Sequence, residues 1–213
     1  MNQTIQDYLV AQIPKRSVFF TKMEEFAKEN HVPIMEADSL HAMLQIMAIQ
    51  QPKRILELGT AIGYSALRMQ DVLPNAEIVT IERDEERHQT ALENIERYGA
   101  NNIDCVLGDA LIDADKLLEK GPYDAIFIDA AKAQYEKFFA LYTPSLNQKG
   151  VLYSDNVLFK GLALDESDEV KKKARVARKM RDFNQFLVEQ ENFVTTTIPL
   201  GDGLAITRRS EIS

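Results

Sequence analysis

Residues 54–65 read RILELGTAIGYS, and this stretch decides the fold of the chain. An apolar run that predicts a strand (54–58) leads into a glycine turn, and a helix starts directly after it. Gly59 and Gly63 let the backbone approach a ligand closely because they carry no Cβ, and the helix start presents unpaired N–H groups. The glycine spacing is not GxGxxG, which disfavours a dinucleotide-dependent dehydrogenase.

Downstream of this stretch, apolar strands continue to alternate with helices. The helix that follows residue 84 has acids in its first turn and Gly99 at its end, as helix termini prefer. Apolar strands alternating with helices predict an α/β fold, with a parallel sheet covered by helices on both faces. We expect the further strands at 77–82, 103–107, 123–129 and 150–155.

The beginning and the end of the chain depart from this alternation. Residues 1–50 read as helices, with the clearest helical spacing of apolar residues at 40–47 and further helical segments at 4–12 and 17–29. The tail, residues 192–209, predicts an antiparallel hairpin around a GDG turn.

We therefore expect one domain over residues 1–213. Its helical extension would span 1–50 and its α/β core 51–213.

The composition is that of an ordinary globular protein. The chain has 213 residues, of which 45% are hydrophobic and 27% charged, and its net charge is −8. We find no apolar run of about 18 residues, so no membrane span is expected, and the N-terminus lacks a secretory signal pattern. The single cysteine, Cys105, allows no internal disulfide and reads as a buried free thiol. These features predict a cytoplasmic protein.

Three oxygen-bearing side chains stand at the carboxyl ends of two predicted strands. Asp129 ends YDAIFID, and Asp155 and Asn156 follow GVLYS. Ligands bind at this edge of a parallel sheet, and two carboxylates with an amide oxygen suit Mg²⁺ or Mn²⁺. The trio therefore predicts a divalent-metal site.

Two further acids accompany the glycine turn. Glu57 precedes Gly59, and Glu82 ends the second strand, where an acid can bind both hydroxyls of a ribose. The alternative is that both are surface acids near strand ends. The order of strand, glycine turn, helix, strand and acid favours an adenosine pocket.

Together these motifs resemble a known family. The segments ELGTAIGYS (57–65), IER (81–83), GDA (108–110), IDAAK (128–132) and DNV (155–157) resemble the class I S-adenosylmethionine-dependent methyltransferases, and PLGDGL near the end also fits. More narrowly, they resemble the divalent-metal-dependent O-methyltransferases of the catechol and caffeoyl-CoA type. The resemblance runs from about residue 32 to 208. It implies a Rossmann-like, mostly parallel seven-stranded sheet with the hairpin at its end.

The resemblance also implies roles for individual residues. S-adenosylmethionine would be bound by Met35, Glu57, Gly59, Ser65, Glu82, Asp109, Ala110 and Asp129. The metal ligands would be Asp129, Asp155 and Asn156. The catalytic residues would be Lys132, as the base, and Asp129. The alternative for Lys132 is a surface lysine on the loop after the fourth strand.

The substrate is the point on which the sequence leaves alternatives open. The stretches expected to cover the substrate (14–20 and 157–170) match neither the catechol nor the caffeoyl-CoA enzymes well. The chain resembles bacterial enzymes that methylate 5-hydroxyuridine at the wobble position of tRNA, which is our leading prediction. The alternative is a small molecule with two vicinal oxygens, and a third possibility is a non-catalytic binding protein. The family also implies a homodimer.

A basic helix, expected at about residues 168–190, bears on this choice. Residues 171–181 carry seven positive charges and no negative charge. Such a run is either a solvated helix face or a surface that binds phosphates of a tRNA anticodon loop. The candidate RNA contacts are Lys171, Lys172, Lys173, Arg175, Arg178 and Lys179, with Lys15 and Arg16 near the N-terminus.

Overall fold

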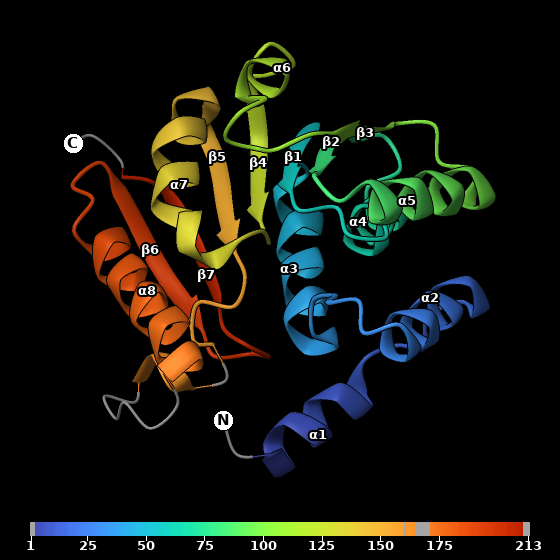
Figure 1. The fold of residues 1–213 in the computed structure, drawn as a ribbon, viewed down its shortest axis with the longest axis horizontal. Coiled ribbons are helices and arrows are strands. Elements are labelled where there is room, and N and C mark those ends of the chain that lie inside the picture. The colour runs from blue at the N-terminus through green and yellow to red at the C-terminus, as the bar shows by residue number, and fades with distance from the viewer. Residues whose placement is uncertain (1–2, 160, 165–170, 211–213) are drawn as a thin grey trace.

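The computed structural model describes residues 3–159, 161–164 and 171–210. In this part of the chain, seven strands form one sheet in the order β3-β2-β1-β4-β5-β7-β6 (Figure 1). The strands are β1 (Arg54–Leu58), β2 (Glu77–Glu82), β3 (Ile103–Leu107), β4 (Tyr123–Ile128), β5 (Leu146–Ser154), β6 (Phe193–Ile198) and β7 (Leu204–Arg209).

The sheet is parallel from β3 to β5 and antiparallel beyond. β1 pairs with β2 and β4, β2 with β3, and β4 with β5, all in parallel. β7 inserts between β5 and β6 and is antiparallel to both. The predicted α/β fold and the final antiparallel hairpin are therefore confirmed.

Strand ends differ from the predicted bounds at β4 and β5. β1, β2 and β3 have the predicted bounds, but β4 ends at Ile128 and β5 runs from Leu146 to Ser154. The early start of β5 reflects an irregular pairing, in which Tyr123 faces Leu146 before the register shifts. Asp129 and Asp155 therefore stand one residue past the ends of neighbouring strands, where their N–H groups still donate to the backbone oxygens of Leu58 and Ile128 at 3.0 and 3.1 Å.

Helices cover both faces of this sheet. Figure 1 shows α7 and α8 on one side, with α3, α4 and α5 on the other. The helices are α1 (Gln3–Gln12), α2 (Val18–Glu29), α3 (Ala37–Gln50), α4 (Tyr64–Val72), α5 (Glu85–Tyr98), α6 (Ala114–Leu118), α7 (Tyr135–Tyr142) and α8 (Lys171–Val188). The helical N-terminus is as predicted. For α8 the expected start at 168–170 lies outside the described residues.

Alternating side chains divide the core into two hydrophobic layers. Ile55 and Phe127 pack with α2–α5 on one face of the sheet, whereas Leu56 and Ile126 pack with α6–α8 on the other. Because both faces are covered, the central strands are largely apolar, as is usual in a parallel sheet, and Glu57 on β1 is a buried exception. None of the described helices is long and apolar enough to cross a membrane.

Local signals explain where the helices next to the site begin and end. The side chain of Asp84 caps α5 by accepting a hydrogen bond from the Arg87 N–H at 3.0 Å. Gly99 ends the same helix in the left-handed conformation, with φ 78°. Gly63 starts α4 with φ 81°. The glycine turn therefore aims the N-terminus of α4 across the carboxyl edge of the sheet.

Candidate active site

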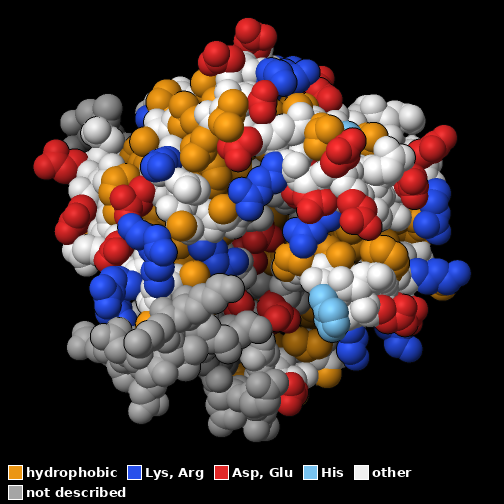
Figure 2. Space-filling view, viewed as in Figure 1, with side chains coloured by type: hydrophobic (Ala, Val, Ile, Leu, Met, Phe, Trp, Pro, Cys, Tyr) orange, Lys and Arg blue, Asp and Glu red, His pale blue; other side chains and the backbone are white. Residues whose placement is uncertain are grey.

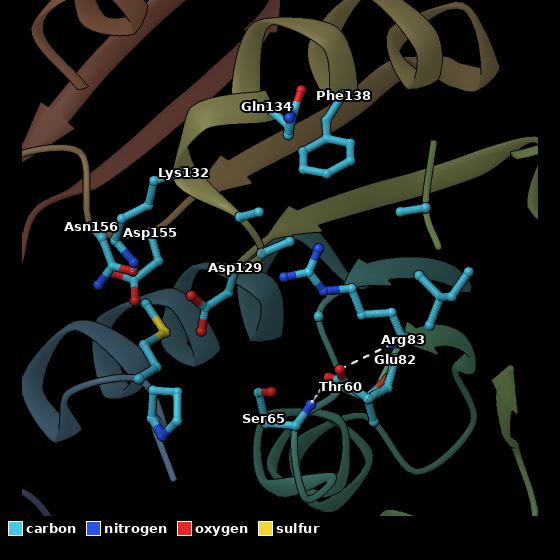
Figure 3. Close-up of a pocket in the computed structure, with 18 of the residues that line it drawn as sticks. Thr60, Ser65, Glu82, Arg83, Asp129, Lys132, Gln134, Phe138, Asp155 and Asn156 are labelled. Carbon is cyan, nitrogen blue, oxygen red and sulfur yellow. Dashed lines mark hydrogen bonds between the residues drawn. The ribbon is translucent and has the colours of Figure 1, made fainter. Parts of the chain in front are cut away.

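A cavity of about 620 Å³ opens at the carboxyl ends of β1, β2, β4 and β5 (Figure 3). Its walls come from the glycine turn, the ends of these strands, the linker 33–36 and the turn between β6 and β7. Most of the predicted site residues line it: Met35, Gly59, Ser65, Glu82, Asp109, Ala110, Asp129, Lys132, Asp155 and Asn156.

Gly59 is required by the closeness of two strand ends. Its φ is 105°, and a Cβ at this position would lie 2.1 Å from the backbone oxygen of Asp129. Any side chain would therefore force β1 and β4 apart where the cavity begins. The sequence predicts that Gly59 allows a ligand to approach the backbone. In the structure, the absence of its side chain allows β1 and β4 to lie close together.

Glu82 is held by backbone donors at the end of β2. Its carboxylate accepts hydrogen bonds from the N–H groups of Ala61 at 2.8 Å, and of Arg83 and Asp84 at 3.0 Å each. The side chain is almost fully buried but lines the cavity. This fixed carboxylate retains lone pairs that can accept hydrogen bonds from ribose hydroxyls.

Glu57 lies behind the cavity wall, not on it. It is fully buried and accepts hydrogen bonds from the hydroxyls of Ser65 and Thr80. Burial raises its pKa to about 7, although those two hydrogen bonds lower it. The family resemblance implies that Glu57 binds the cofactor, whereas in the structure its carboxyl group supports Ser65, which does line the cavity.

Asp155 and Asp129 form a buried acidic wall, with the cation Lys132 beside it. Asp155 is 1% exposed, and neither of its carboxylate oxygens has a hydrogen-bond partner among the described residues. Burial raises the pKa of both acids. For Asp155 the neighbouring Asp129 raises the pKa further, and the nearby Asn156 backbone N–H lowers it. Lys132 lowers and Asp202 raises the pKa of both acids. A buried carboxylate without a partner is costly, so this wall favours the binding of a cation.

Asn156 and Lys132 complete the group beside these acids. Lys132, in a short 3₁₀ helix (Lys132–Gln134), donates a 2.5 Å hydrogen bond from Nζ to Oδ1 of Asn156. Asn156 has φ 60°, a left-handed value that Asn tolerates better than most residues, and it lines the cavity. Figure 3 shows Lys132, Asn156 and Asp155 close together, with Asp129 facing them.

These residues fit a hard divalent ion. The donors are oxygen atoms only, two from carboxylates and one from an amide, as Mg²⁺ and Mn²⁺ prefer. The unpartnered oxygens of Asp155 supply the observation on which the fit rests. Among the described residues no three His, Cys, Asp or Glu side chains form a metal-binding group, so the candidate site depends on the Asn156 amide.

The predicted RNA contacts fall into three groups. Arg175, Arg178 and Lys179 are exposed on α8, and Lys15 is exposed in the linker before α2. Arg16 differs, because its guanidinium pairs with Glu24 at 2.5 Å. Lys171, Lys172 and Lys173 begin α8, but their side chains lie outside the described part of the structure.

The basic helix lies next to the cavity. α8 packs against the 3₁₀ helix that contains Lys132, and Asn184 donates to the backbone oxygen of Val157, just after the acidic wall. Figure 2 shows acidic atoms within the hollow and Lys and Arg atoms at its edge, with further Lys and Arg atoms to the left, over α8.

The structure adds residues to the cavity for which the sequence predicted no role. They include Tyr64, Arg83, Gln134, Phe138, Phe159 and Asp202. Asp202 belongs to the GDG turn, which was part of the resemblance and could have been singled out. Phe138 and Gln134 come from α7 and its preceding turn, where nothing in the local pattern distinguishes a cavity residue from a core residue.

Comparisons with known proteins agree with this geometry. A family model described as O-methyltransferase matches residues 12–210. A catechol O-methyltransferase from Niastella koreensis is 39% identical over 130 residues, covering 58% of each chain. A Staphylococcus aureus structure provisionally named a caffeoyl-CoA O-methyltransferase is 34% identical, covers 98% of both chains and has a TM-score of 0.86.

A third protein shares the fold at lower identity. The Podospora anserina methyltransferase PaMTH1, solved with S-adenosylhomocysteine (SAH) bound, is 22% identical, with a TM-score of 0.86 over 98% of this chain and 95% of its own.

Proposed function

The chain belongs to the O-methyltransferase family, and from that premise we propose that it transfers a methyl group from S-adenosylmethionine to one of two neighbouring oxygens on a small hydroxylated molecule. The unpartnered carboxylate of Asp155, on the cavity wall beside Asp129 and Asn156, is the observation that carries this proposal. Relatives named for catechol and caffeoyl-CoA support a small-molecule substrate.

The cofactor would occupy the side of the cavity formed by β1, α4 and β2. Ser65 and Gly59 would bind its methionine part, Glu82 its ribose, and Asp109 with Ala110 its adenine. Methyl transfer breaks the bond between carbon and sulfur and forms one between carbon and oxygen, so the two atoms must lie in line. Positioning of this kind can supply several kcal/mol of the rate enhancement.

The acidic wall would hold the metal through Asp129, Asp155 and Asn156. A divalent ion there would favour the ionised form of a hydroxyl and fix its direction. Lys132 lies beside Asn156, and we propose that it accepts the proton which the hydroxyl loses. The substrate's second oxygen would keep the reacting oxygen oriented toward the methyl group.

A second candidate substrate is 5-hydroxyuridine in a tRNA anticodon loop. Its 5-hydroxyl lies beside a carbonyl oxygen and offers the same pair of oxygens. The exposed cations of α8, next to the cavity, favour this candidate, because a splayed base leaves flanking phosphates to be held. The homodimer and the cytoplasmic location stay predictions.

The test is methyl transfer from labelled S-adenosylmethionine with Mg²⁺, to catechol and to tRNA that contains 5-hydroxyuridine. We expect label in at least one substrate, lost with chelator and in Asp155→Ala but retained in Asp115→Ala, an exposed acid of α6. Label in catechol alone supports the small-molecule reaction, and label in tRNA alone supports the second candidate. Full transfer by Asp155→Ala would contradict the metal site.

A further inference from the structure

A network of charged and aromatic side chains joins the N-terminal helices to the helix that follows the glycine turn. It lies outside the acidic wall and has no part in the reaction proposed above. Its members come from three places: Arg16 from the linker before α2, Phe20 and Glu24 from α2, and Tyr64 and Arg68 from α4.

Glu24 is the centre of this network. Its carboxylate accepts two hydrogen bonds from the Arg16 guanidinium, at 2.5 and 2.9 Å, and a third from the hydroxyl of Tyr64. Burial raises the pKa of Glu24, but Arg16 and Tyr64 outweigh it and hold this pKa below its usual value. Glu24 is therefore an ionised, partly buried acid with charge-assisted hydrogen bonds to both sides.

Tyr64 is fixed from two directions. Its hydroxyl donates to Glu24 and accepts a hydrogen bond from Arg68 at 3.0 Å. The Arg68 guanidinium also lies over the ring of Phe20, 5.1 Å from its centroid. Residues of α2 thus contact α4 through both a hydrogen-bond chain and a cation–π contact.

Both ends of this network reach the cavity. Tyr64 lines it directly, next to Ser65. At the other end, α2 leads into the linker 33–36, which forms a separate part of the cavity wall and includes Met35. The relative position of these two walls therefore depends on how firmly α2 is held against α4.

We infer that Glu24 is a positioning residue for the cofactor, because it couples the N-terminal segment to Tyr64 and so sets the two walls around the methionine end. This inference rests on the proposed function for the identity of the cofactor. It extends that function by assigning part of the cofactor affinity to a residue that does not contact the cofactor.

Binding of the reaction product SAH by calorimetry tests this assignment. We expect Glu24→Gln to weaken SAH binding about tenfold, the scale of one charge-assisted hydrogen bond. Glu25→Gln is the matched control, since this neighbour on α2 is exposed and undergoes the same change of charge. Equal affinity of the two variants would overturn the inference.

A second variant distinguishes the coupling between Glu24 and Tyr64 from an effect of poor folding on SAH affinity. Tyr64→Phe removes only the hydroxyl, and we expect a similar loss of SAH affinity. In the double variant the two losses should not add, because both remove the same hydrogen bond. Full additivity would overturn the coupling even if Glu24→Gln folds poorly.

Hydrogen exchange gives a readout that a purely structural role would not change. In the wild-type protein, SAH should slow amide exchange in residues 13–30. This effect should be lost in Glu24→Gln and kept in Glu25→Gln. If the wild-type protein binds no SAH, the proposed function itself fails; if it binds SAH and the variants behave alike, only this inference fails.

Discussion

The acidic wall of the cavity and the basic face of α8 differ both in the sign of their charge and in their exposure, because the acids are buried and the cations are exposed. Asp155 is 1% exposed and has no partner for either carboxylate oxygen among the described residues, whereas Arg175 and Lys179 lie in solvent. A buried charge is costly unless something balances it, but an exposed charge costs little and is screened by salt. Binding of a cation would therefore stabilise the acidic wall, whereas the basic face of α8 is stable in solvent without a bound anion.

Removal of the buried charge should have the largest effect. Asp155→Ala is expected to lower methyl transfer in Mg²⁺ about a thousandfold, since a metal supplies several kcal/mol of stabilisation. Without metal the same variant should melt at a higher temperature than the wild-type protein, because an unpaired buried acid is gone. Thermal melts in chelator and labelled transfer assays check both, and a lower melting temperature in chelator would show that the carboxyl group stabilises the apo protein.

Glu57 offers a second test of what burial does to a charge. Its pKa is about 7 in the folded protein, above the usual 4.5, so the stability it contributes is complete below 4.5 and is lost as pH rises through 7. The shift corresponds to about 3 kcal/mol at most. Glu57→Gln should remove this part of the pH dependence, as denaturant unfolding at pH 5 and pH 8 would reveal. If Glu57→Gln leaves the difference in unfolding free energy between pH 5 and pH 8 unchanged, Ser65 and Thr80 keep Glu57 ionised.

Lys132 marks the boundary between the two regions, because it is a cation beside the acidic wall. Lys132→Met should lower kcat about a hundredfold, in the range for loss of a general base. Its Mg²⁺ affinity should stay within a few-fold of wild type, since Lys132 is not among the proposed ligands. Single-turnover rates and metal titrations separate the two quantities. A metal affinity that falls as far as the rate would contradict the role of base.

The basic face of α8 should give the smallest effect. Arg175→Glu with Lys179→Glu is expected to weaken tRNA binding about tenfold at low salt and less at high salt. Catechol methylation should not change. Lys53→Glu with Lys149→Glu is the matched control, because both lysines are exposed at the amino ends of β1 and β5, away from the cavity. Equal tRNA binding by the two double variants would show that the basic face of α8 is solvated and does not bind tRNA.

The sequence predicted the strands better than it predicted the walls of the site. β1, β2 and β3 have the predicted bounds because apolar runs between helices leave little choice in a parallel sheet. Asp129, Asp155 and Asn156 come together as expected, since parallel strands end at one edge. Glu57 does not line the cavity, and its contact with the cofactor stays a prediction. Alternation along β1 decides only which face of the sheet it lies on and does not show that Ser65 and Thr80 enclose it.

Arg16 shows the limit of reading charges from sequence. Beside Lys15 it looks like part of a basic surface, but in the structure its guanidinium is held by Glu24. No local pattern pairs residues eight positions apart across the end of a helix. Only the packing of the linker on α2 decides which positive charges remain available.

The sequence by itself determined the order of strands and helices, the glycine turn and the acids at strand ends, because these follow from periodicity and backbone sterics. Tertiary structure decided which charges are buried, which are paired and which segments share a wall. Asp202 reaches the cavity only because β7 inserts between β5 and β6, and Tyr64 is joined to Glu24 only because α2 packs on α4. Burial and pairing depend on contacts between distant segments, and no local pattern encodes them.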